Sequence, residues 1–406
     1  MNEYKMCTQC IMHTGIPGIK LNDEGICNDC LDFIAEKENI KDKSKQEKYI
    51  REMEDLFERA KSNKSGYDAI VLFSGGKDST QLLYMASRVY KLKVLAFAMI
   101  LPIGKPQAVM NMDEVAKKLN VDLIKVSPNE EMYKRYMHYA LVNGDRYGLG
   151  EHVGCAACSF LFRWYAYKLA ISMEIPIILD GRDKWQYGGV LFDKGADVKN
   201  KVINGEKPFG QLHDLYSDAF GNDGDESFFG FNRDELIKKD FPTLIAPYTF
   251  MEYDTLDSFE TIEMLGLNKD NFETMFTNCD GVYLFDYITL KRYNCTSYHK
   301  GYAHGIRQNI PTITQLNVGE KKDAVGMSKE MILKVLDEYK QVLFYIAEKK
   351  LTKKNISDKD KDIIRSMIQV SKQVYGTQAI DIFINRFLAL TEFAEYFNID
   401  LDKEIA

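Results

Sequence analysis

Six of the eight cysteines in this chain stand in Cys-x-x-Cys pairs, and two of these pairs lie close to the N-terminus. Cys7 and Cys10 form the first pair, and Cys27 and Cys30 follow after 16 intervening residues. This spacing is typical of a site in which four thiolates bind one zinc ion in tetrahedral geometry. A segment this short buries too little apolar surface to fold alone, and a bound metal would supply the missing folding free energy. The sequence therefore predicts a structural Zn²⁺ site, and the alternative is four unrelated thiols.

The second feature with chemical potential is a polar loop between a short apolar run at 68–73 and a segment with helical spacing. Its residues are Ser74, Gly75, Gly76, Lys77, Asp78 and Ser79. Backbone N–H groups at a helix N-terminus attract phosphate, and glycine lets the backbone approach the anion. Lys77 adds positive charge, whereas Asp78 would repel phosphate unless it helps to hold Mg²⁺. The pattern predicts a nucleotide-phosphate loop with Mg²⁺, and the alternative is a tight turn with an exposed lysine.

Segment 74–79 resembles the signature of the PP-loop ATP pyrophosphatases, over roughly residues 66–190. It matches neither the Gly-x4-Gly-Lys-Ser/Thr loop nor Gly-x-Gly-x-x-Gly. The resemblance implies that the loop holds the pyrophosphate end of ATP while a substrate oxygen attacks the α-phosphorus. Nitrogen or sulfur then displaces AMP from the adenylated substrate.

The same resemblance implies further contacts to ATP. Ala98 and Met99, at the end of the second expected strand, would contact adenine. Gly181 and Asp183 follow a later strand and would also belong to the site, with Asp183 either a second Mg²⁺ ligand or a helix N-cap. Negative charge gathers at the α-phosphate during adenylation, where Lys77, Mg²⁺ and the helix N-terminus would stabilise it. We therefore expect catalytic roles for Lys77 and for Asp78.

The N-terminal segment resembles that of the N-acetyl sugar amidotransferases, which convert an acetamido group into an acetamidino group with ammonia. The resemblance covers residues 5–35 and is carried by Cys7-Thr8-Gln9-Cys10-Ile11-Met12 and Cys27-Asn28-Asp29-Cys30.

The third cysteine pair departs from that group. Cys155 and Cys158 are expected just before a helix, whose N-terminus lowers thiol pKa values. Their placement resembles the tRNA-thiolation branch of the PP-loop enzymes, which implies a persulfide relay or a [4Fe–4S] cluster held with a third thiol. Cys279 and Cys295 are both candidates for that thiol. The alternative is that Cys155 and Cys158 are small residues at a helix start, without metal.

Short apolar runs alternate with segments of helical spacing between residues 68 and 179. We expect strands at 68–73, 93–99, 122–126 and 176–179, and helices at 78–89, 111–119 and 159–174. This alternation predicts an α/β fold with a doubly wound parallel sheet. From Ser328, a plausible N-cap, the pattern is helical to the C-terminus.

We expect five parts along the chain. They are a zinc ribbon at 1–33, a helical linker at 34–65, a PP-loop ATP-binding domain at 66–200, an insertion or substrate region at 201–320, and a helical region at 321–406.

The charge of the chain is unevenly distributed. The 406 residues include 53 Lys and Arg and 60 Asp and Glu, a net charge of −7. Residues 211–260 carry 12 acidic and 3 basic side chains, so this one segment accounts for the whole excess. Because acid repels a phosphate backbone, a small-molecule or carrier-bound substrate is favoured over nucleic acid, although the zinc ribbon leaves tRNA open.

The sequence shows no apolar run long enough to cross a membrane and no secretory signal, which favours a cytoplasmic protein without membrane partners. We also expect a homo-oligomer.

Together these features predict an ATP pyrophosphatase-type enzyme that adenylates a carbonyl or amide oxygen and replaces it by sulfur. One alternative is amidotransfer to an N-acetyl sugar with ammonia, and another is tRNA thiolation. A sulfur or ammonia donor protein would then be a partner, because no glutaminase domain is recognisable. A different class is a nucleotide-binding protein without catalysis.

Overall fold

The computed structural model of the chain describes residues 4–39, 43–62, 66–183, 189–204, 206, 209–221, 238–253, 255–272, 278–308, 328–375, 377–403 and 405. The chain forms two compact units, and each collects segments that are distant in sequence. The first unit contains residues Met1–Lys41, Met137–Cys155 and Cys279–Ala406, and the second contains Asp42–Tyr136 and Ala156–Asn278. The five-part division expected from the sequence stays a prediction.

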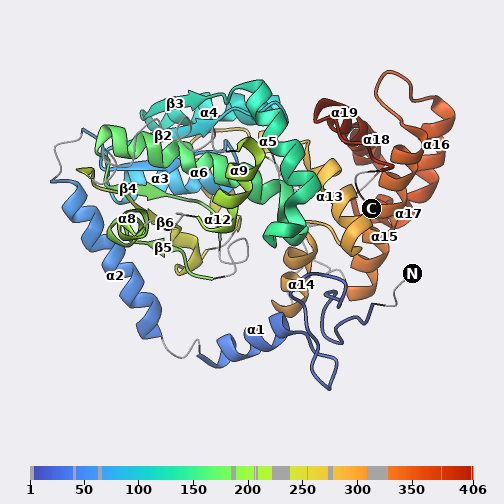
Figure 1. The fold of residues 1–406 in the computed structure, drawn as a ribbon, viewed down its shortest axis with the longest axis horizontal. Helices are drawn as coiled ribbons and strands as arrows, with labels where there is room; N and C mark the ends of the chain where they lie inside the picture. Colours follow the sequence, from blue (N-terminus) through green and yellow to red (C-terminus); the bar gives the residue numbers. More distant parts are fainter. Residues whose placement is uncertain are drawn as a thin grey trace. The chain divides into compact units, whose positions relative to one another are not determined.

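The second unit is built on a six-stranded sheet with the order β3-β2-β1-β4-β6-β5 (Figure 1). The pairs from β3 to β6 are parallel, and β5 is antiparallel to β6. The strands are β1 (Ala69–Leu72), β2 (Val94–Met99), β3 (Asp122–Val126), β4 (Ile177–Leu179), β5 (Phe192–Asp193) and β6 (Thr243–Ile245). The predicted doubly wound parallel sheet is confirmed, and each of the four predicted strands is present.

Burial explains why these runs form strands. All four residues of β1 are buried, as expected for a parallel strand that is covered on both faces. On one face, Ile70 and Leu72 share a core with Ala166 and Tyr167 of the helix that precedes β4. β5 and β6 were not predicted from the sequence.

The predicted helices of the second unit differ from the expectation mainly at their starts, and α8, α9 and α12 were not predicted. They are α2 (Lys43–Ala60), α3 (Lys77–Tyr84) with a π-helical continuation at Met85–Val89, α4 (Pro106–Leu119), α8 (Gly195–Ile203), α9 (Gln211–Phe220) and α12 (Thr255–Met264). α4 begins five residues before the expected 111, because Pro106 stands at its first turn, where a missing N–H is tolerated. α5 (Glu130–Asn143) and α6 (Val153–Met173) each run from one unit into the other.

The first unit is helical around α13 (Val282–Tyr293), in which the residues from Val282 to Leu290 are buried. Its other helices are α1 (Asn28–Asn39), α14 (His299–Gln308), α15 (Lys329–Lys349), α16 (Asp358–Met367), α17 (Gln369–Tyr375), α18 (Thr377–Phe387) and α19 (Ala389–Tyr396). The predicted N-cap is confirmed, since the Ser328 hydroxyl accepts the Met331 N–H at 3.2 Å. Among the described residues, no helix combines the length and apolar character needed to cross a membrane.

Candidate functional site

The predicted phosphate loop connects β1 to α3, as the sequence pattern required. Gly76 is the N-cap of α3 and has no side chain with which to cap the helix. The first-turn N–H groups of α3 are therefore left to an external acceptor, and the helix dipole favours an anion there. Lys77 and Asp78 are the first two residues of the helix and are partly buried.

Gly75 is required by the packing of this loop. It has φ +71°, a conformation that side-chain-bearing residues rarely adopt. A Cβ at this position would lie 2.2 Å from the carbonyl oxygen of Ala108 in α4. A Cβ at Gly76 would lie 2.8 Å from the Asn278 side-chain nitrogen. The two glycines thus let the loop pass between two neighbouring segments.

The polar side chains of the loop bond to one another. The Ser74 and Ser79 hydroxyl oxygens are 3.1 Å apart, and the Ser79 hydroxyl also donates to the Gly76 carbonyl at 3.1 Å. The Lys77 ammonium donates to the Asp78 carboxylate. These contacts bring the polar side chains of the loop together, and their predicted role in binding ATP stays a prediction.

The topology brings a second predicted segment to the same place. β1 lies between β2 and β4, so the chain reverses its direction of progress across the sheet at the β1–β4 boundary. Ligands of doubly wound sheets bind at the carboxyl ends of the strands on either side of such a point. Gly181 follows β4, and a Cβ built on it would lie 3.4 Å from the Ser79 Cα and 3.5 Å from the Asp78 carbonyl oxygen.

The remaining predicted contacts to ATP stay predictions. Ala98 is buried and Met99 partly buried at the carboxyl end of β2, beside β1. Asp183 is partly buried, but residues 184–188 lie outside the described residues, so its N-cap alternative is untested. Next to it, Arg182 bonds to the buried Asp180 carboxylate, with Nη2 2.6 Å from Oδ2.

Sequence reasoning missed Asn111, which holds the loop from α4. Its side-chain nitrogen donates to the Gly75 carbonyl at 3.1 Å and to the Asn271 carbonyl at 2.9 Å. A signal was present, since Asn111 is an amide in the otherwise apolar buried face of residues 106–119. A buried amide of this kind must find partners, which here are loop carbonyls.

Two tyrosines near Asp78 were also missed. The Tyr253 hydroxyl donates to the Asp78 carboxylate, and the Tyr248 hydroxyl lies 3.5 Å from the Asp78 carbonyl oxygen. Burial, and then the negative charge of Asp78, raise the pKa of Tyr253 far above its ordinary value. No sequence signal could identify them, because they lie about 170 residues from the loop.

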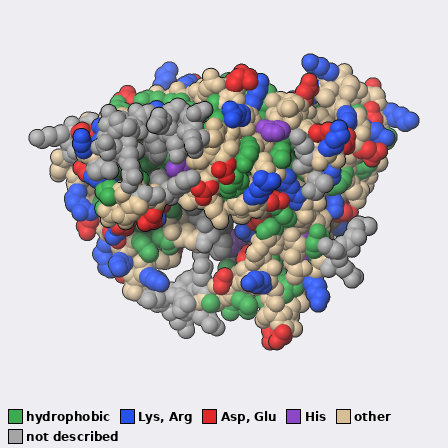
Figure 2. All heavy atoms as spheres, viewed as in Figure 1, with side chains coloured by type: hydrophobic (Ala, Val, Ile, Leu, Met, Phe, Trp, Pro, Cys, Tyr) green, Lys and Arg blue, Asp and Glu red, His purple; other side chains and the backbone are tan. Residues whose placement is uncertain are grey.

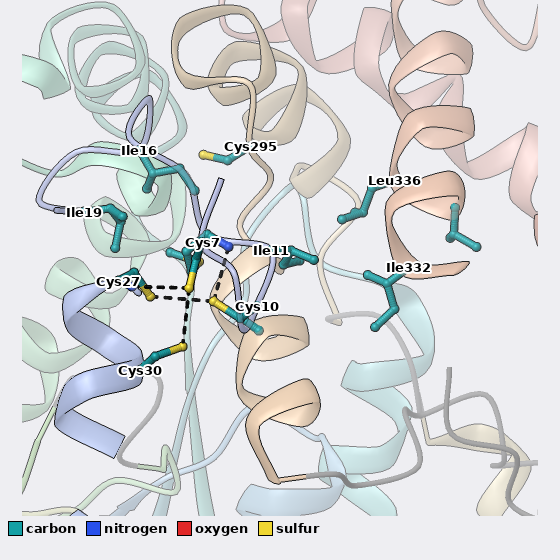
Figure 3. Packing of buried hydrophobic residues seen from close by; sticks show 13 residues of the cluster. Cys7, Cys10, Ile11, Ile16, Ile19, Cys27, Cys30, Cys295, Ile332 and Leu336 are labelled. Carbon is teal, nitrogen blue, oxygen red and sulfur yellow. Dashed lines mark hydrogen bonds between the residues drawn. The ribbon is translucent and has the colours of Figure 1, made fainter. Parts of the chain in front are cut away.

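The four N-terminal cysteines form a compact group in the first unit (Figure 3). Cys7 and Cys30 have sulfur atoms 3.8 Å apart, those of Cys10 and Cys27 are 3.6 Å apart, and all four lie within 4.8 Å of one another. Four sulfurs at ~2.3 Å around a tetrahedral ion would be about 3.8 Å apart. The geometry therefore fits one metal ion with four sulfur ligands.

Backbone donors surround these sulfurs. The N–H groups of Gln9 and Cys27 lie 3.4 and 3.3 Å from the Cys7 sulfur, and that of Met12 lies 3.4 Å from the Cys10 sulfur. Burial raises the pKa of Cys7, but these backbone bonds outweigh it and lower the pKa to about 7. The site thus already stabilises one thiolate, as metal binding requires.

The cysteine module does not have a core of its own, which agrees with the expectation that it is too small for one. Its buried side chains, such as Ile11 and Ile16, share a cluster with Ile332 and Leu336 of α15 (Figure 3). The Lys329 ammonium also donates to the Cys7 carbonyl at 2.7 Å.

Arg307 of α14 supplies a positive charge beside the thiols. Its side chain is 5% exposed, and Asp29 lies 3.7 Å from its Nη2 atom. Among the described residues, its buried Nε and Nη2 atoms make no hydrogen bond of ordinary geometry. Burial lowers the pKa of Arg307, but Cys10, Cys30 and Asp29 together raise it above its ordinary value. A metal with four thiolates would carry a charge of about −2 and offer sulfur acceptors to this guanidinium.

The third cysteine pair, Cys155 and Cys158, lies inside a helix, not just before one. α6 begins at Val153, so Cys155 is in its first turn and Cys158 follows on the same face. The sequence placed the start near 159, because no N-cap residue marks Val153. Burial raises the pKa of Cys158 to about 11, although the Tyr133 hydroxyl, 3.4 Å away, opposes this.

The two candidates for a third thiol differ in burial. Cys295 is fully buried and packs in the same cluster as the N-terminal cysteines, but outside their sulfur group (Figure 3). Cys279 is partly buried. In the part of the chain that the structure describes, the four N-terminal cysteines are the group of three or more metal-ligating side chains found close together. A cluster at Cys155 and Cys158 stays a prediction.

The acidic character expected for residues 211–260 is only partly described, since 222–237 lie outside the described residues. On the face drawn in Figure 2, acidic and basic side chains are intermixed.

Comparison with known proteins gives distant relatives. No protein-family model matches the chain. An uncharacterized protein of Methanocaldococcus jannaschii is 26% identical over 179 residues, which are 44% of this chain and 58% of that protein's length. The chain therefore spans less than two thirds of this relative.

Three solved structures are similar at low scores. NMN synthetase from Francisella tularensis has 12% identity and a TM-score of 0.34, covering 73% of this chain and 93% of that one. The U34-tRNA thiolase NcsA from Methanococcus maripaludis, solved with its [4Fe-4S] cluster, has 14% identity and a TM-score of 0.29, covering 80% of this chain and 94% of that one. NH3-dependent NAD synthetase from Campylobacter jejuni has 12% identity and a TM-score of 0.31, covering 68% of this chain and 98% of that one. All three TM-scores lie below 0.5, so these similarities carry no conclusion about function.

Proposed function

We propose that this chain is an ATP-dependent enzyme that adenylates a carbonyl or amide oxygen, releases pyrophosphate, and then exchanges that oxygen for sulfur. The observation that carries the proposal is the meeting of two loops at the carboxyl ends of β1 and β4. Gly181 lies against Asp78 and Ser79, at the position where doubly wound sheets bind their ligands.

Each loop residue has a role in this chemistry. The N–H groups of α3 and the Lys77 ammonium would bind the pyrophosphate end of ATP and stabilise charge at the α-phosphate. Asp78 is the residue that would hold Mg²⁺, which adds further charge stabilisation when bound. Gly75 and Asn111 keep the backbone in place.

We propose that the four N-terminal cysteines hold zinc in a structural role. All four are buried and all four ligand positions come from cysteine. A closed site of this type keeps no position for substrate and contributes to folding.

The spacing of Cys155 and Cys158 on one face of α6 supports sulfur as the atom that replaces the oxygen. The terminal sulfur of a persulfide on Cys155 would attack the adenylated carbon, and AMP would leave with the oxygen. Cys158 would then attack the Cys155 sulfur, which releases the transferred sulfur with the substrate and leaves a disulfide. A sulfur donor protein and a cellular thiol reductant would complete the cycle. Small or carrier-bound acceptors and tRNA are compared as candidate acceptors in the pyrophosphate-release assay.

Nitrogen transfer is the second candidate. The observed four-cysteine group occupies the segment that resembles the N-acetyl sugar amidotransferases. In this reaction ammonia attacks the same adenylated carbon, and Cys155 and Cys158 have no part.

Pyrophosphate release on mixing with ATP, Mg²⁺ and candidate acceptors tests the proposal. We expect release with the true acceptor, and loss of release in Lys77→Ala. The control is Lys93→Ala, an exposed lysine at the opposite end of the sheet. Mass spectrometry of the product distinguishes sulfur from nitrogen, and Cys155→Ala should stop only sulfur transfer. ATP binding without pyrophosphate release for every acceptor would favour a non-catalytic nucleotide-binding protein.

A further inference from the structure

The Asp78 carboxylate accepts two hydrogen bonds within the protein. The same oxygen, Oδ1, accepts hydrogen bonds from the Lys77 ammonium and from the Tyr253 hydroxyl. Tyr253 comes from a distant segment between β6 and α12. A carboxylate needed for a cation is therefore held by a phenol from another part of the second unit.

Tyr253 is held firmly in this position. Its hydroxyl lies 2.8 Å from the Ser258 hydroxyl, and Ser258 is fully buried in α12. Its ring stacks on that of Tyr248 with centroids 4.1 Å apart. The Tyr248 hydroxyl in turn lies 3.5 Å from the Asp78 carbonyl oxygen. The two tyrosines thus contact both the side chain and the backbone of Asp78.

A hydrogen-bond donor and a cation compete for the same oxygen. Mg²⁺ demands close oxygen ligands in near-ideal octahedral geometry and accepts little distortion. A proton on the phenol oxygen and a metal ion cannot both lie on the same lone-pair side of Asp78 Oδ1. Lys77 and Tyr253 both donate to Oδ1, which has two lone pairs. Binding of the ion through this oxygen therefore requires one of the two bonds to open.

We propose that Tyr253 is a latch on Asp78, which opens when Mg²⁺ and nucleotide bind together. The inference rests on the proposed function, because it concerns the same Mg²⁺ and ATP site. While the latch is closed, Asp78 has a low affinity for Mg²⁺ alone, so the metal enters with the nucleotide. Opening it releases the Tyr253 hydroxyl from Asp78, so nucleotide binding is coupled to the position of Tyr253. Tyr253 is a positioning residue in this scheme and not a catalytic one.

The test is the Mg²⁺ dependence of ATP binding, measured by calorimetry as MgCl₂ is varied, together with Mg²⁺ binding in the absence of nucleotide. Tyr253→Phe removes the donor and keeps the ring. We expect it to tighten Mg²⁺ binding about tenfold, which is the low end of the effect of one hydrogen bond to a charged group. A merely structural role would lower the melting temperature without tightening metal binding.

The matched control is Tyr84→Phe. Tyr84 also joins α3 to α12, through a contact of 3.7 Å between its hydroxyl and the Met264 sulfur, but it lies away from the loop. We expect unchanged Mg²⁺ binding. Ser258→Ala is a second variant, in case Tyr253→Phe does not fold; it loosens the phenol and should tighten Mg²⁺ binding in the same direction.

The outcomes separate the two proposals. Wild-type protein that binds neither ATP nor Mg²⁺ overturns the proposed function and the latch with it. Wild-type protein that binds both, with unchanged or weaker Mg²⁺ binding in Tyr253→Phe and Ser258→Ala, overturns the latch alone. Tighter Mg²⁺ binding in these variants, with Tyr84→Phe unchanged, supports the latch.

Discussion

Replacement of Gly75 by alanine should destabilise the loop at 74–79. The effect should be larger than that of the same replacement at glycines of this unit with open space around the Cβ position, such as Gly189 and Gly210. The added Cβ would lie 2.2 Å from the Ala108 carbonyl oxygen, where contacts below 3.0 Å are essentially never found. The opposing atom is backbone, so no side chain can rotate away. The loop and α4 must separate, or the strain must remain.

The cost has two parts. The left-handed conformation costs a residue other than glycine ~1–2 kcal/mol. Overpacking against a fixed neighbour costs a further ~1–3 kcal/mol. A total of about 2–5 kcal/mol corresponds to a fall of roughly 5–20 °C in melting temperature for a unit of this size. Relief of the clash widens the contact from 2.2 to at least 3.0 Å, which exceeds the ~0.5 Å tolerance of a binding site.

Thermal unfolding and calorimetric ATP titration measure these two effects. Two glycines of the same unit separate the contributions. Gly210 has φ +53° and open space around its Cβ position, so Gly210→Ala should show only the conformational cost. Gly189 has open space without a positive φ, so Gly189→Ala should change little. Neither control should alter ATP affinity, whereas Gly75→Ala should lower it more than tenfold.

A Gly75→Ala variant with the melting temperature of Gly189→Ala and the ATP affinity of the wild type would refute both the strain and the clash. If Gly75→Ala lowers the melting temperature only as much as Gly210→Ala, the positive φ is costly but the contact with the Ala108 carbonyl oxygen is not. Normal stability with lost ATP binding would show that the loop yields without cost.

Three further predictions concern the first unit and the third cysteine pair, Cys155 and Cys158. Arg307→Gln should release the metal of the four-cysteine site faster to a chelator than the wild type, with partial rescue in Arg307→Lys, because the charged side chain offsets the negative thiolates; equal release rates would exclude this role. Burial raises the pKa of Asp286 to about 6 from an ordinary 3.8, so its contribution to stability is present below pH 3.8 and is lost as pH rises through 6. This contribution is roughly 3 kcal/mol, and in Asp286→Asn the corresponding pH dependence of unfolding should vanish; an unchanged pH profile would contradict it. Iodoacetamide should modify Cys155 before Cys158 at neutral pH, because the pKa of Cys158 is raised to about 11, and peptide mapping would reveal the opposite order.

The sequence alone was sufficient wherever the relevant interactions are local. The strands β1, β2 and β4 are short apolar runs, and burial on both faces of a parallel sheet requires such runs. At the sheet edge, β3 is partly exposed and carries Asp122 and Lys125. The phosphate loop was predicted because its glycines, its lysine and its position before a helix lie within six residues. The cysteine spacing predicted the group that the fold assembles, because one metal site with paired ligands tolerates few spacings.

Other features depended on how distant segments meet. Tyr253 and Asn111 contact the loop, and Arg307 lies beside the cysteines, from positions far along the chain. A side chain that contacts a partner far along the chain leaves no recognisable pattern in its own part of the sequence. Asn111 is the exception, because it is an amide on the otherwise apolar buried face of α4. The start of α6 was also misplaced, since Val153 has no capping signal and the helix begins where packing permits. Local residue patterns thus determined the loop and the four-cysteine group. Tertiary packing decided that Tyr253 contacts Asp78 and that Arg307 lies beside the cysteines, because desolvation and charge compensation arise only when distant segments are buried together.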